Sequence, residues 1–404
     1  MKPRLVSLFS GAGGMDKGFV NAGFDIVWAN DFDKDAVNTY KKNFGDHIVL
    51  GDITKIPSNE IPDNIDVVIG GFPCQGFSVN NTKRNMEDQR NFLYRELLRI
   101  VRDKQPKVFV AENVKGLLSM EKGQVIGMIK SDFEQLGYKV NYKLLLAAEY
   151  GVPELRERVI IIGNRIDAEN KYPTPTHYVD YKGYSKNKNL PHTPTVEETI
   201  GFLSDERLRD EPFYVNGRLI QNHIASEKVA DTFWGRKYSV NQFDICDYLK
   251  EWRKRSGWST MRIDKHFGYR HTAGHWFRKD NGSGSIPKPE DWWELKKIMG
   301  FDDKYDKVVT TLELKDITFE QSLRISNWDR PSDTITATQP EIHPNKKRRL
   351  SARECAMIQT FPDDFEFTGS LNSQYRQIGN AVPVLLATKI AECVMDMLGT
   401  KKED

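Results

Sequence analysis

The chain has little cysteine, and the cysteines it has are widely spaced. Its 404 residues contain four, and no two of them form a C-x-x-C pair or a zinc-ligand spacing. The sequence therefore gives no support for a disulfide framework or a zinc site, and we expect reduced thiols in a cytosolic protein. The four are Cys74, Cys246, Cys355 and Cys393.

Long hydrophobic runs, an export signal and a strong net charge are also missing. No apolar run reaches the ~20 residues of a membrane span, and the first residues have the pattern of a short strand rather than of a signal peptide. Lysine and arginine (59) nearly balance aspartate and glutamate (57). Any affinity for nucleic acid must therefore come from local clusters of basic residues. The length, with 39% apolar residues, allows two domains and a sizeable core.

One cysteine, Cys74, has an informative setting. An apolar, β-branched run at residues 65–69 stops at two glycines, and Pro73 and Cys74 follow at once. Glycines let backbone approach a substrate closely, and proline stiffens the chain beside the sulfur. Because open α/β sheets bind ligands at the loops that leave their strands, Cys74 is a candidate nucleophile. A buried, inert thiol is the alternative that these residues alone leave open.

Three other strand ends carry residues that suit a nucleotide-like cofactor. A short apolar strand runs into a glycine-rich turn at residues 11–14, after which we expect a helix. Predicted strands at residues 24–28 and 47–50 lead to Asp31 and Asp52. An acid about 20 residues after the glycines is placed to hold ribose hydroxyls. The glycine spacing is not G-x-G-x-x-G, which argues against an NAD-dependent Rossmann enzyme.

Short apolar runs alternate with helical patterns over residues 1–175. Further strands are predicted at residues 108–111, 144–147 and 159–163. This alternation is typical of a mostly parallel sheet covered by helices, so we expect an α/β, Rossmann-like fold. After Pro175 the alternation is lost, and aromatic and charged residues dominate up to about residue 325.

Eight short motifs follow one another along the chain. They are Phe9-Ser10-Gly11-Ala12-Gly13-Gly14, Asn30-Asp31-Phe32, Gly51-Asp52-Ile53, Pro73-Cys74-Gln75, Glu112-Asn113-Val114, Tyr150-Gly151-Val152-Pro153 with Arg156 and Arg158, Arg349-Leu350-Ser351-Ala352-Arg353-Glu354, and Gln377-Ile378-Gly379-Asn380-Ala381-Val382-Pro383. In this order the chain resembles the DNA (cytosine-5)-methyltransferase family almost from end to end. Two positions depart from the family pattern. Glu154 stands where Gln is usual and cannot donate hydrogen bonds as an amide does, and Ser351 replaces a more usual Thr at a predicted helix cap.

The resemblance implies a Rossmann-like methyltransferase domain with a smaller target-recognition domain inserted in it. We expect the catalytic domain to comprise residues 1–175 and 371–404, so that the C-terminal tail folds back onto the first domain. The target-recognition domain would then comprise residues 176–370.

The resemblance also implies the catalytic roles. Cys74 is the nucleophile, which adds to carbon 6 of a cytosine swung out of the duplex. Glu112 contacts ring N3 and the exocyclic amine, Arg158 contacts the cytosine carbonyl, and Arg156 supports the site. Glu112 follows a buried strand, so desolvation should raise its pKa and let it give a proton. Without the resemblance, a surface glutamate and exposed salt-bridge arginines would be the simpler interpretations.

The methyl donor implied by the family is S-adenosylmethionine, which leaves as S-adenosylhomocysteine. By resemblance, Asp31 fits the ribose hydroxyls, Phe32 the adenine face, and Asp52 with Ile53 the adenine edge. Ordinary core packing is the alternative for the apolar members of this set. No metal is expected. The full set of predicted cofactor residues is Phe9, Gly11, Gly13, Asp31, Phe32, Asp52, Ile53, Pro73, Asn380 and Val382.

Residues 241–300 form the basic part of the predicted target-recognition domain. Helices are predicted at residues 244–255 and 259–267, the second ended by Gly268, and a third segment at residues 269–278 would complete a helix-turn-helix-like arrangement. A small aromatic core with a solvated basic face is the alternative. A helix is also predicted near residues 90–102, and its arginines could touch phosphates or simply line a solvated face. The candidate DNA contacts are Gln75, Ser78, Arg270, His271 and Arg278.

These observations lead to one functional hypothesis and two alternatives. The hypothesis is a sequence-specific methyltransferase acting on cytosine carbon 5 in double-stranded DNA. A tRNA cytosine-5 methyltransferase shares the fold and nucleophile, and a catalytically inactive DNA-binding homologue is the third interpretation. We expect a monomer in the prokaryotic cytoplasm, associated with the nucleoid or encoded by a phage. A separately acting restriction endonuclease is a candidate partner, and no membrane is expected.

Overall fold

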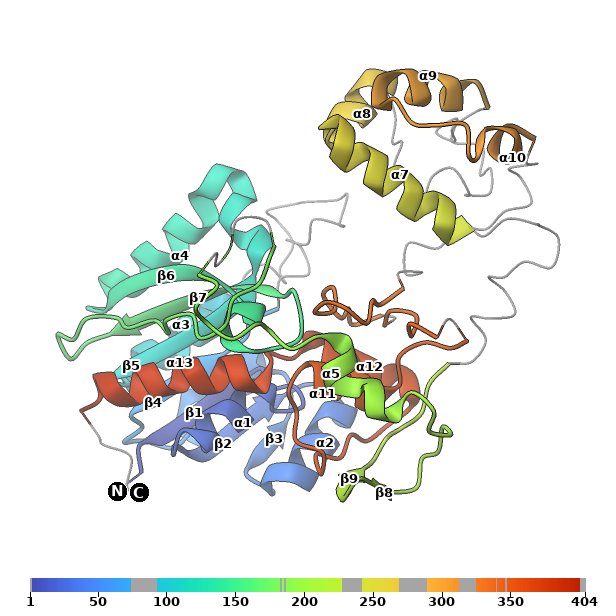
Figure 1. Cartoon of the computed structure of the whole chain (residues 1–404). Coiled ribbons are helices and arrows are strands. Elements are labelled where there is room, and N and C mark those ends of the chain that lie inside the picture. Colours follow the sequence, from blue (N-terminus) through green and yellow to red (C-terminus); the bar gives the residue numbers. More distant parts are fainter. Residues whose placement is uncertain are drawn as a thin grey trace. The chain divides into compact units, whose positions relative to one another are not determined.

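The computed structural model describes residues 2–73, 93–181, 184, 187–226, 242–268, 289–311, 325–338, 340–345 and 347–399 (Figure 1). The chain divides into two compact units. The larger unit comprises Met1–Ser226, Ser326–Pro340 and Leu350–Asp404. The smaller unit comprises Glu227–Ile325 and Glu341–Arg349.

A mixed sheet organises the larger unit. Its seven strands lie in the order β3-β2-β1-β4-β5-β7-β6. They are β1 (Arg4–Leu8), β2 (Asp25–Asp31), β3 (Ile48–Leu50), β4 (Val67–Gly70), β5 (Val108–Val114), β6 (Lys139–Leu146) and β7 (Glu157–Asn164). Strands β3, β2, β1, β4 and β5 pair in parallel, whereas β7 is antiparallel to both β5 and β6. The predicted α/β class is confirmed.

Alternating side chains on the central strands build a core on each face of this sheet. Leu5, Val67 and Ile69 point to one face, and Val6 and Val68 point to the other, as the two-residue period of a strand requires. The first face is covered by α1 (Gly14–Asn21), α2 (Lys34–Phe44) and α13 (Val384–Met397). The second face is covered by α3 (Tyr94–Lys104) and α4 (Gln124–Gln135).

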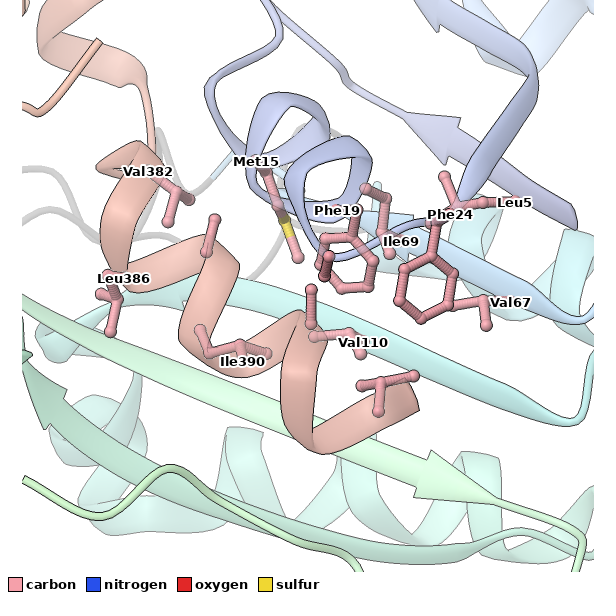
Figure 2. Close-up of a cluster of buried hydrophobic side chains, with 14 of the residues drawn as sticks. Leu5, Met15, Phe19, Phe24, Val67, Ile69, Val110, Val382, Leu386 and Ile390 are labelled. Carbon is pink, nitrogen blue, oxygen red and sulfur yellow. The ribbon is translucent and has the colours of Figure 1, made fainter. Parts of the chain in front are cut away.

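The last helix of the chain belongs to the first of these cores. Figure 2 shows Leu386 and Ile390 of α13 beside Met15 and Phe19 of α1. The two helices approach so closely that a Cβ on Gly18 would lie 2.4 Å from Cβ of Ala387. Residues near the two ends of the sequence therefore share one hydrophobic core.

A third core joins segments on both sides of the smaller unit's sequence. Val196, Ile200 and Leu203 pack with Ile358 and Tyr375. Residues 176–226, 326–340 and 350–370, which were predicted to lie in the inserted domain, belong to the larger compact unit. Their apolar side chains have partners only there among the described residues, and this packing was not readable from composition. The elements involved are α5 (Val196–Ile200), β8 (Phe213–Val215), β9 (Arg218–Ile220), α11 (Ala352–Ile358) and α12 (Leu371–Asn380).

The described part of the smaller unit between residues 242 and 311 is mostly helical. It contains α7 (Gln242–Ser256), α8 (Thr260–Phe267), α9 (Pro289–Met299) and α10 (Asp306–Thr311) around Trp292, which is fully buried. Two helices predicted here are confirmed. Ser259 caps α8, and Gly268 ends it with a φ of 76°. The third predicted segment, with Arg270, His271 and Arg278, lies outside the described residues.

The structure also shows where sequence patterns were less informative. Strand β6 begins at Lys139, five residues before the predicted strand, because exposed polar side chains alternate with buried Val140 on this edge strand. Among the described residues, one stretch, Leu371–Met397, is long and apolar enough to cross a membrane. Of its most apolar window, 67% is buried in the protein, as in a core helix.

Candidate active site

Several predicted cofactor residues lie on the loops that follow the carboxyl ends of the parallel strands. Strand β1 lies between β2 and β4, so the strand order reverses there. Open α/β sheets bind ligands at the carboxyl ends of the strands where the strand order reverses. The loops after β1, β2, β3 and β4 leave the carboxyl ends of their strands and carry Phe9, Phe32, Asp52 and Pro73.

The turn between β1 and α1 is held in a conformation that few residues adopt. Phe9 has a φ of 54°, and Gly11 and Gly13 have φ values of 55° and 91°. A non-glycine residue in this region costs free energy and marks a backbone fixed by its surroundings. At Gly13, a Cβ would lie 2.4 Å from the ring of Phe44. This glycine turn thus presents backbone without side chains between the carboxyl end of β1 and the start of α1.

Asp31 and Phe32 form a pair of opposite character. The Asp31 carboxylate accepts hydrogen bonds from the Gly11 and Asp33 N–H groups, each at 2.8 Å. Burial raises the pKa of Asp31, and these hydrogen bonds oppose that shift. Phe32, the next residue, is 70% exposed. A carboxylate with free lone pairs next to an uncovered aromatic face fits a ribose and a purine ring.

Asp52 and Ile53 are used in part by the protein itself. The Asp52 carboxylate accepts from the Thr54 backbone at 3.1 Å and from its hydroxyl at 2.8 Å. The side-chain hydrogen bond from Thr54 contributes most to lowering the pKa of Asp52. Ile53 is buried, and Arg99 of α3 donates to its carbonyl at 3.0 Å. Arg99 therefore fixes the loop at Ile53. This role differs from both sequence-based interpretations of Arg99, which were a phosphate contact and a solvated helix face.

The loop after β4 is anchored at Phe72, two residues before the predicted nucleophile. Asn113 is buried, and its Nδ2 donates to the Phe72 carbonyl at 3.1 Å. A Cβ on Gly71 would lie 3.0 Å from Oε2 of Glu112, so the backbone passes directly over this carboxylate. Cys74, Gln75 and Ser78 lie outside the described residues, which resume at residue 93.

Glu112 and Arg158 meet because of the antiparallel register of β5 and β7. Glu112 pairs with Ile160, so Arg158 is its diagonal neighbour two residues along the strand. Nε of Arg158 lies 2.7 Å from Oε1 of Glu112, and both side chains are 11% exposed. Burial raises the pKa of Glu112, and the charges of Arg158 and Arg156 oppose this shift. Burial likewise lowers the pKa of Arg158, to about 10.

Arg156 makes a different set of contacts. It is fully buried and donates to Oε1 of Glu154 at 3.2 Å, to the Ile335 carbonyl at 3.1 Å and to the Gly379 carbonyl at 2.7 Å. The two arginines of the motif therefore have different contacts. Arg158 faces the acid, and Arg156 holds backbone segments together behind it.

The C-terminal motif lies against the glycine turn. A Cβ on Gly14 would lie 2.7 Å from the carbonyl oxygen of Val382, and Val382 itself is buried. Asn380 ends α12 and is exposed. The predicted cap at Ser351 is confirmed, since its hydroxyl accepts from the Glu354 N–H at 3.1 Å and its own N–H donates to the Glu354 carboxylate.

Comparison with known proteins decides what this arrangement belongs to. A family model described as C-5 cytosine-specific DNA methylase matches residues 3–396. The chain belongs to this family. This DNA cytosine-5-methyltransferase carries the eight sequence motifs on a chain with the α/β fold described above.

Curated relatives and solved structures extend the match over the whole chain. The Type II methyltransferase M.NgoFVII of Neisseria gonorrhoeae is 33% identical over 410 residues, covering 100% of this chain and 89% of the relative. The Type II methyltransferase M1.HphI of Haemophilus parahaemolyticus is 32% identical, covering 98% and 88%. Among solved structures, a prophage-encoded DNA modification methyltransferase of E. coli has a TM-score of 0.60 at 21% identity, covering 98% of this chain and 100% of the other. The Entamoeba histolytica methyltransferase EhMeth has a TM-score of 0.53 at 15% identity, covering 98% and 99%.

The structure gives three residues of the methyltransferase contacts that the sequence did not predict. Asn113 fixes the loop at Phe72, Arg99 fixes the Ile53 loop, and Glu154 pairs with Arg156. The position of Asn113, directly after the candidate acid at the end of a strand, is the one signal that could have indicated a supporting role. The Ile53 carbonyl lies 46 residues from Arg99, and Ile335, which donates to Glu154, lies 181 residues away, beyond the reach of local patterns.

Proposed function

We propose that this methyltransferase modifies carbon 5 of a cytosine within a specific sequence of double-stranded DNA, through a transient covalent bond between Cys74 and the base. The observation that supports this most directly is the buried Glu112–Arg158 pair beside the backbone of Gly71. In the sequence Cys74 follows Gly71 by three residues.

Carbon 5 of cytosine is a weak nucleophile, so the enzyme must activate the ring. Addition of the Cys74 thiolate to carbon 6 converts the ring to an enamine, with carbon 5 as its nucleophilic end. Glu112 in its protonated form transfers its proton to ring N3, which neutralises the negative charge that the addition creates. S-adenosylmethionine, when bound, supplies the electrophilic methyl group. A solvent base then takes the carbon 5 proton as the thiolate leaves carbon 6, and the proton on N3 returns to Glu112, which restores the aromatic ring.

Burial supports the acid role of Glu112. Desolvation disfavours the carboxylate and raises the pKa, so the proton is retained to a higher pH than in an exposed glutamate. Arg158 donates to the cytosine carbonyl once the base displaces its contact with Glu112. Nε of Arg158 lies 2.7 Å from Oε1 of Glu112, so this is the contact that the base would displace.

The residues at the sheet edge fit S-adenosylmethionine. Asp31 would hold the ribose hydroxyls, Phe32 would stack on adenine, and Ile53 with Asp52 would line its edge. Phe9 would face the sulfonium. Asn380 and Val382 would close the site from the C-terminal side, against Gly14.

The substrate must leave its duplex to be reached. We therefore include base flipping in the proposal, with Gln75 and Ser78 contacting the opened duplex. The smaller unit would read the sequence, with Arg270, His271 and Arg278 as candidate base contacts. Because the relatives are named Type II methyltransferases, we further propose a cognate restriction endonuclease and a cytoplasmic site of action.

Nucleoside analysis of the methylated product tests the chemistry. Purified enzyme, duplex DNA and S-adenosylmethionine should yield 5-methylcytosine, and Cys74→Ser should bind cofactor normally but yield none. A product of N4-methylcytosine or N6-methyladenine would overturn the proposal. Methylation of tRNA in preference to DNA would instead support the tRNA alternative.

A further inference from the structure

Glu154 occupies a position that its charge makes unusual. It is fully buried, and it lies where the family's arginine motif usually carries Gln. A buried carboxylate is costly unless it is paired and hydrogen-bonded. The partners of Glu154 therefore indicate what the negative charge does.

The backbone around Glu154 is joined to a segment that is distant in sequence. Ser332 donates its N–H to the Pro153 carbonyl at 2.9 Å, and Leu155 donates its N–H to the Ser332 carbonyl at 2.7 Å. The Thr334 hydroxyl adds a bond to the Leu155 carbonyl at 2.9 Å. Residues 153–155 and 332–334 thus form a short parallel pairing just before β7.

The Glu154 side chain completes this junction. Oε1 accepts from the Ile335 N–H at 2.7 Å and from Arg156 at 3.2 Å, while Arg156 donates to the Ile335 carbonyl at 3.1 Å. The ion pair therefore satisfies both backbone groups of Ile335. Through Arg156 it also reaches the Gly379 carbonyl at 2.7 Å, next to the cofactor residue Asn380.

Gly379 shows how tightly this junction is packed. A Cβ there would lie 2.4 Å from the backbone carbon of Thr336. The pairing thus fixes three segments together: the start of β7 that carries Arg158, residues 332–337, and the end of α12. Residues 332–337 lead to Pro340, where the chain leaves the larger unit.

Charge balance gives a second reason for a carboxylate. Two arginines, Arg156 and Arg158, and two glutamates, Glu112 and Glu154, lie together with little exposure, so an ionised Glu154 leaves one net positive charge in this set when Glu112 holds its proton. With Gln at position 154, the charge of Arg156 would have no buried counterpart. It would then act fully on Glu112, whose pKa Arg156 already lowers.

We propose that Glu154 is a positioning residue for the methyl transfer: its carboxylate clamps Ile335 to Arg156 and neutralises Arg156 behind the Glu112–Arg158 pair. This inference rests on the proposed acid role of Glu112 for its rate readout. The charged groups facing Glu112 from the described elements are Arg158 and Arg156, while Gly71 on the β4 side carries none.

Two variants of the full chain separate charge from shape. Glu154→Gln keeps an acceptor for the Ile335 N–H but removes the charge, and Glu154→Asp keeps the charge on a shorter side chain. Glu197→Gln, at an exposed position, is the matched control. We expect Glu154→Gln to shift the alkaline limb of the pH–rate profile by about 0.5–1 unit toward lower pH. The direction follows because an unbalanced Arg156 lowers the pKa of Glu112, and the reactive form is protonated.

The Asp variant should keep the wild-type limb, and the affinity for S-adenosylmethionine should change less than about 2-fold in both variants. An unshifted limb in Glu154→Gln would overturn the charge role. An equal loss of rate in the Gln and Asp variants, at every pH, would show a purely structural role and would also overturn it.

Thermal unfolding tests the pairing without using activity. Glu154→Gln and Arg156→Gln should each lower the melting temperature, and the double variant should recover part of the loss, because the second substitution removes the charge left unpaired by the first. Strictly additive losses would overturn the clamp. If the wild-type enzyme failed to make 5-methylcytosine, the proposed function would fail, and this measurement would still decide the clamp.

Discussion

Asn113 donates a hydrogen bond across 3.1 Å to the carbonyl of Phe72, two residues before Cys74. The amide thereby ties the strand that carries Glu112, the proposed acid, to the loop that leads to Cys74, the proposed nucleophile. Glu112 on β5 and the loop after β4 are thus linked within the same sheet, although they belong to different strands.

Asn113→Ala should slow methyl transfer far more than it destabilises the fold. Loss of the amide leaves a buried carbonyl unpaired, which costs about 1–3 kcal/mol, whereas a loop displaced by about 1 Å can cost about 100-fold in rate. Single-turnover methylation and urea denaturation measure the two effects. The exposed Asn189→Ala serves as control, and an unchanged rate in Asn113→Ala would contradict the anchoring role.

Glu112→Gln should lower the methylation rate by about 100-fold or more, because the amide donates a hydrogen bond but transfers no proton. The pKa of Glu112 is raised by burial, so the protonated, reactive form is lost only as pH rises through this raised value. The wild-type rate should therefore fall on the alkaline side, and the variant should lack this limb. A variant that retains the limb would show that another group titrates.

The same raised pKa has a consequence for stability. The folded state binds the Glu112 proton more tightly than the unfolded chain does, so this contribution is complete below the ordinary glutamate pKa. It is lost as pH rises through the raised folded value. Compared with Glu112→Gln, the wild-type melting temperature should decline more over this interval, and parallel curves would contradict the shift.

Phe32→Ala should weaken cofactor binding without affecting the fold. Phe32 is 70% exposed, so little packing is lost, while an aromatic stack on a base contributes about 1–3 kcal/mol. Calorimetry should show a loss of affinity for S-adenosylmethionine of about 10-fold or more. Tyr214→Ala, at a residue 72% exposed, is the matched control. Equal affinities in the two variants would remove Phe32 from the site.

Ile390→Ala should destabilise the methyltransferase by about 2–5 kcal/mol, because it deletes a fully buried side chain of α13 from the first core. Denaturant unfolding gives this value. Ile166→Ala, at a residue 36% exposed, should cost much less. Equal losses would mean that α13 does not share the core of β1 and α1.

Much of this molecule was predictable from local patterns. The strands that carry Asp31 and Glu112 are mostly apolar runs that end at polar residues. Such a run predicts a strand, its burial and the point where the following loop begins. Helix α8 was bounded by its cap Ser259 and by Gly268, whose positive φ stops a helix. The order of the motifs supplied the family, which the matched model confirms.

Other features depend on contacts between residues far apart in sequence. The packing of Val196 and Ile200 against Tyr375 decides where the compact units divide, and no composition shift near residue 175 reveals it. The junction of Glu154 with Ile335 joins residues 181 positions apart. Strand β6 was shortened in the prediction because an edge strand alternates polar and apolar residues and lacks a continuous apolar run.

Trapping with 5-fluorocytosine tests the covalent route most directly. A duplex carrying this base at the target position has no carbon 5 proton to lose, so the thiolate cannot be expelled after methyl transfer. Mass spectrometry of the digested complex should find a methylated 5-fluorocytosine bonded to the peptide that contains Cys74. An enzyme that methylates ordinary duplex at full rate, yet gives no such adduct or one through another residue, would contradict the account.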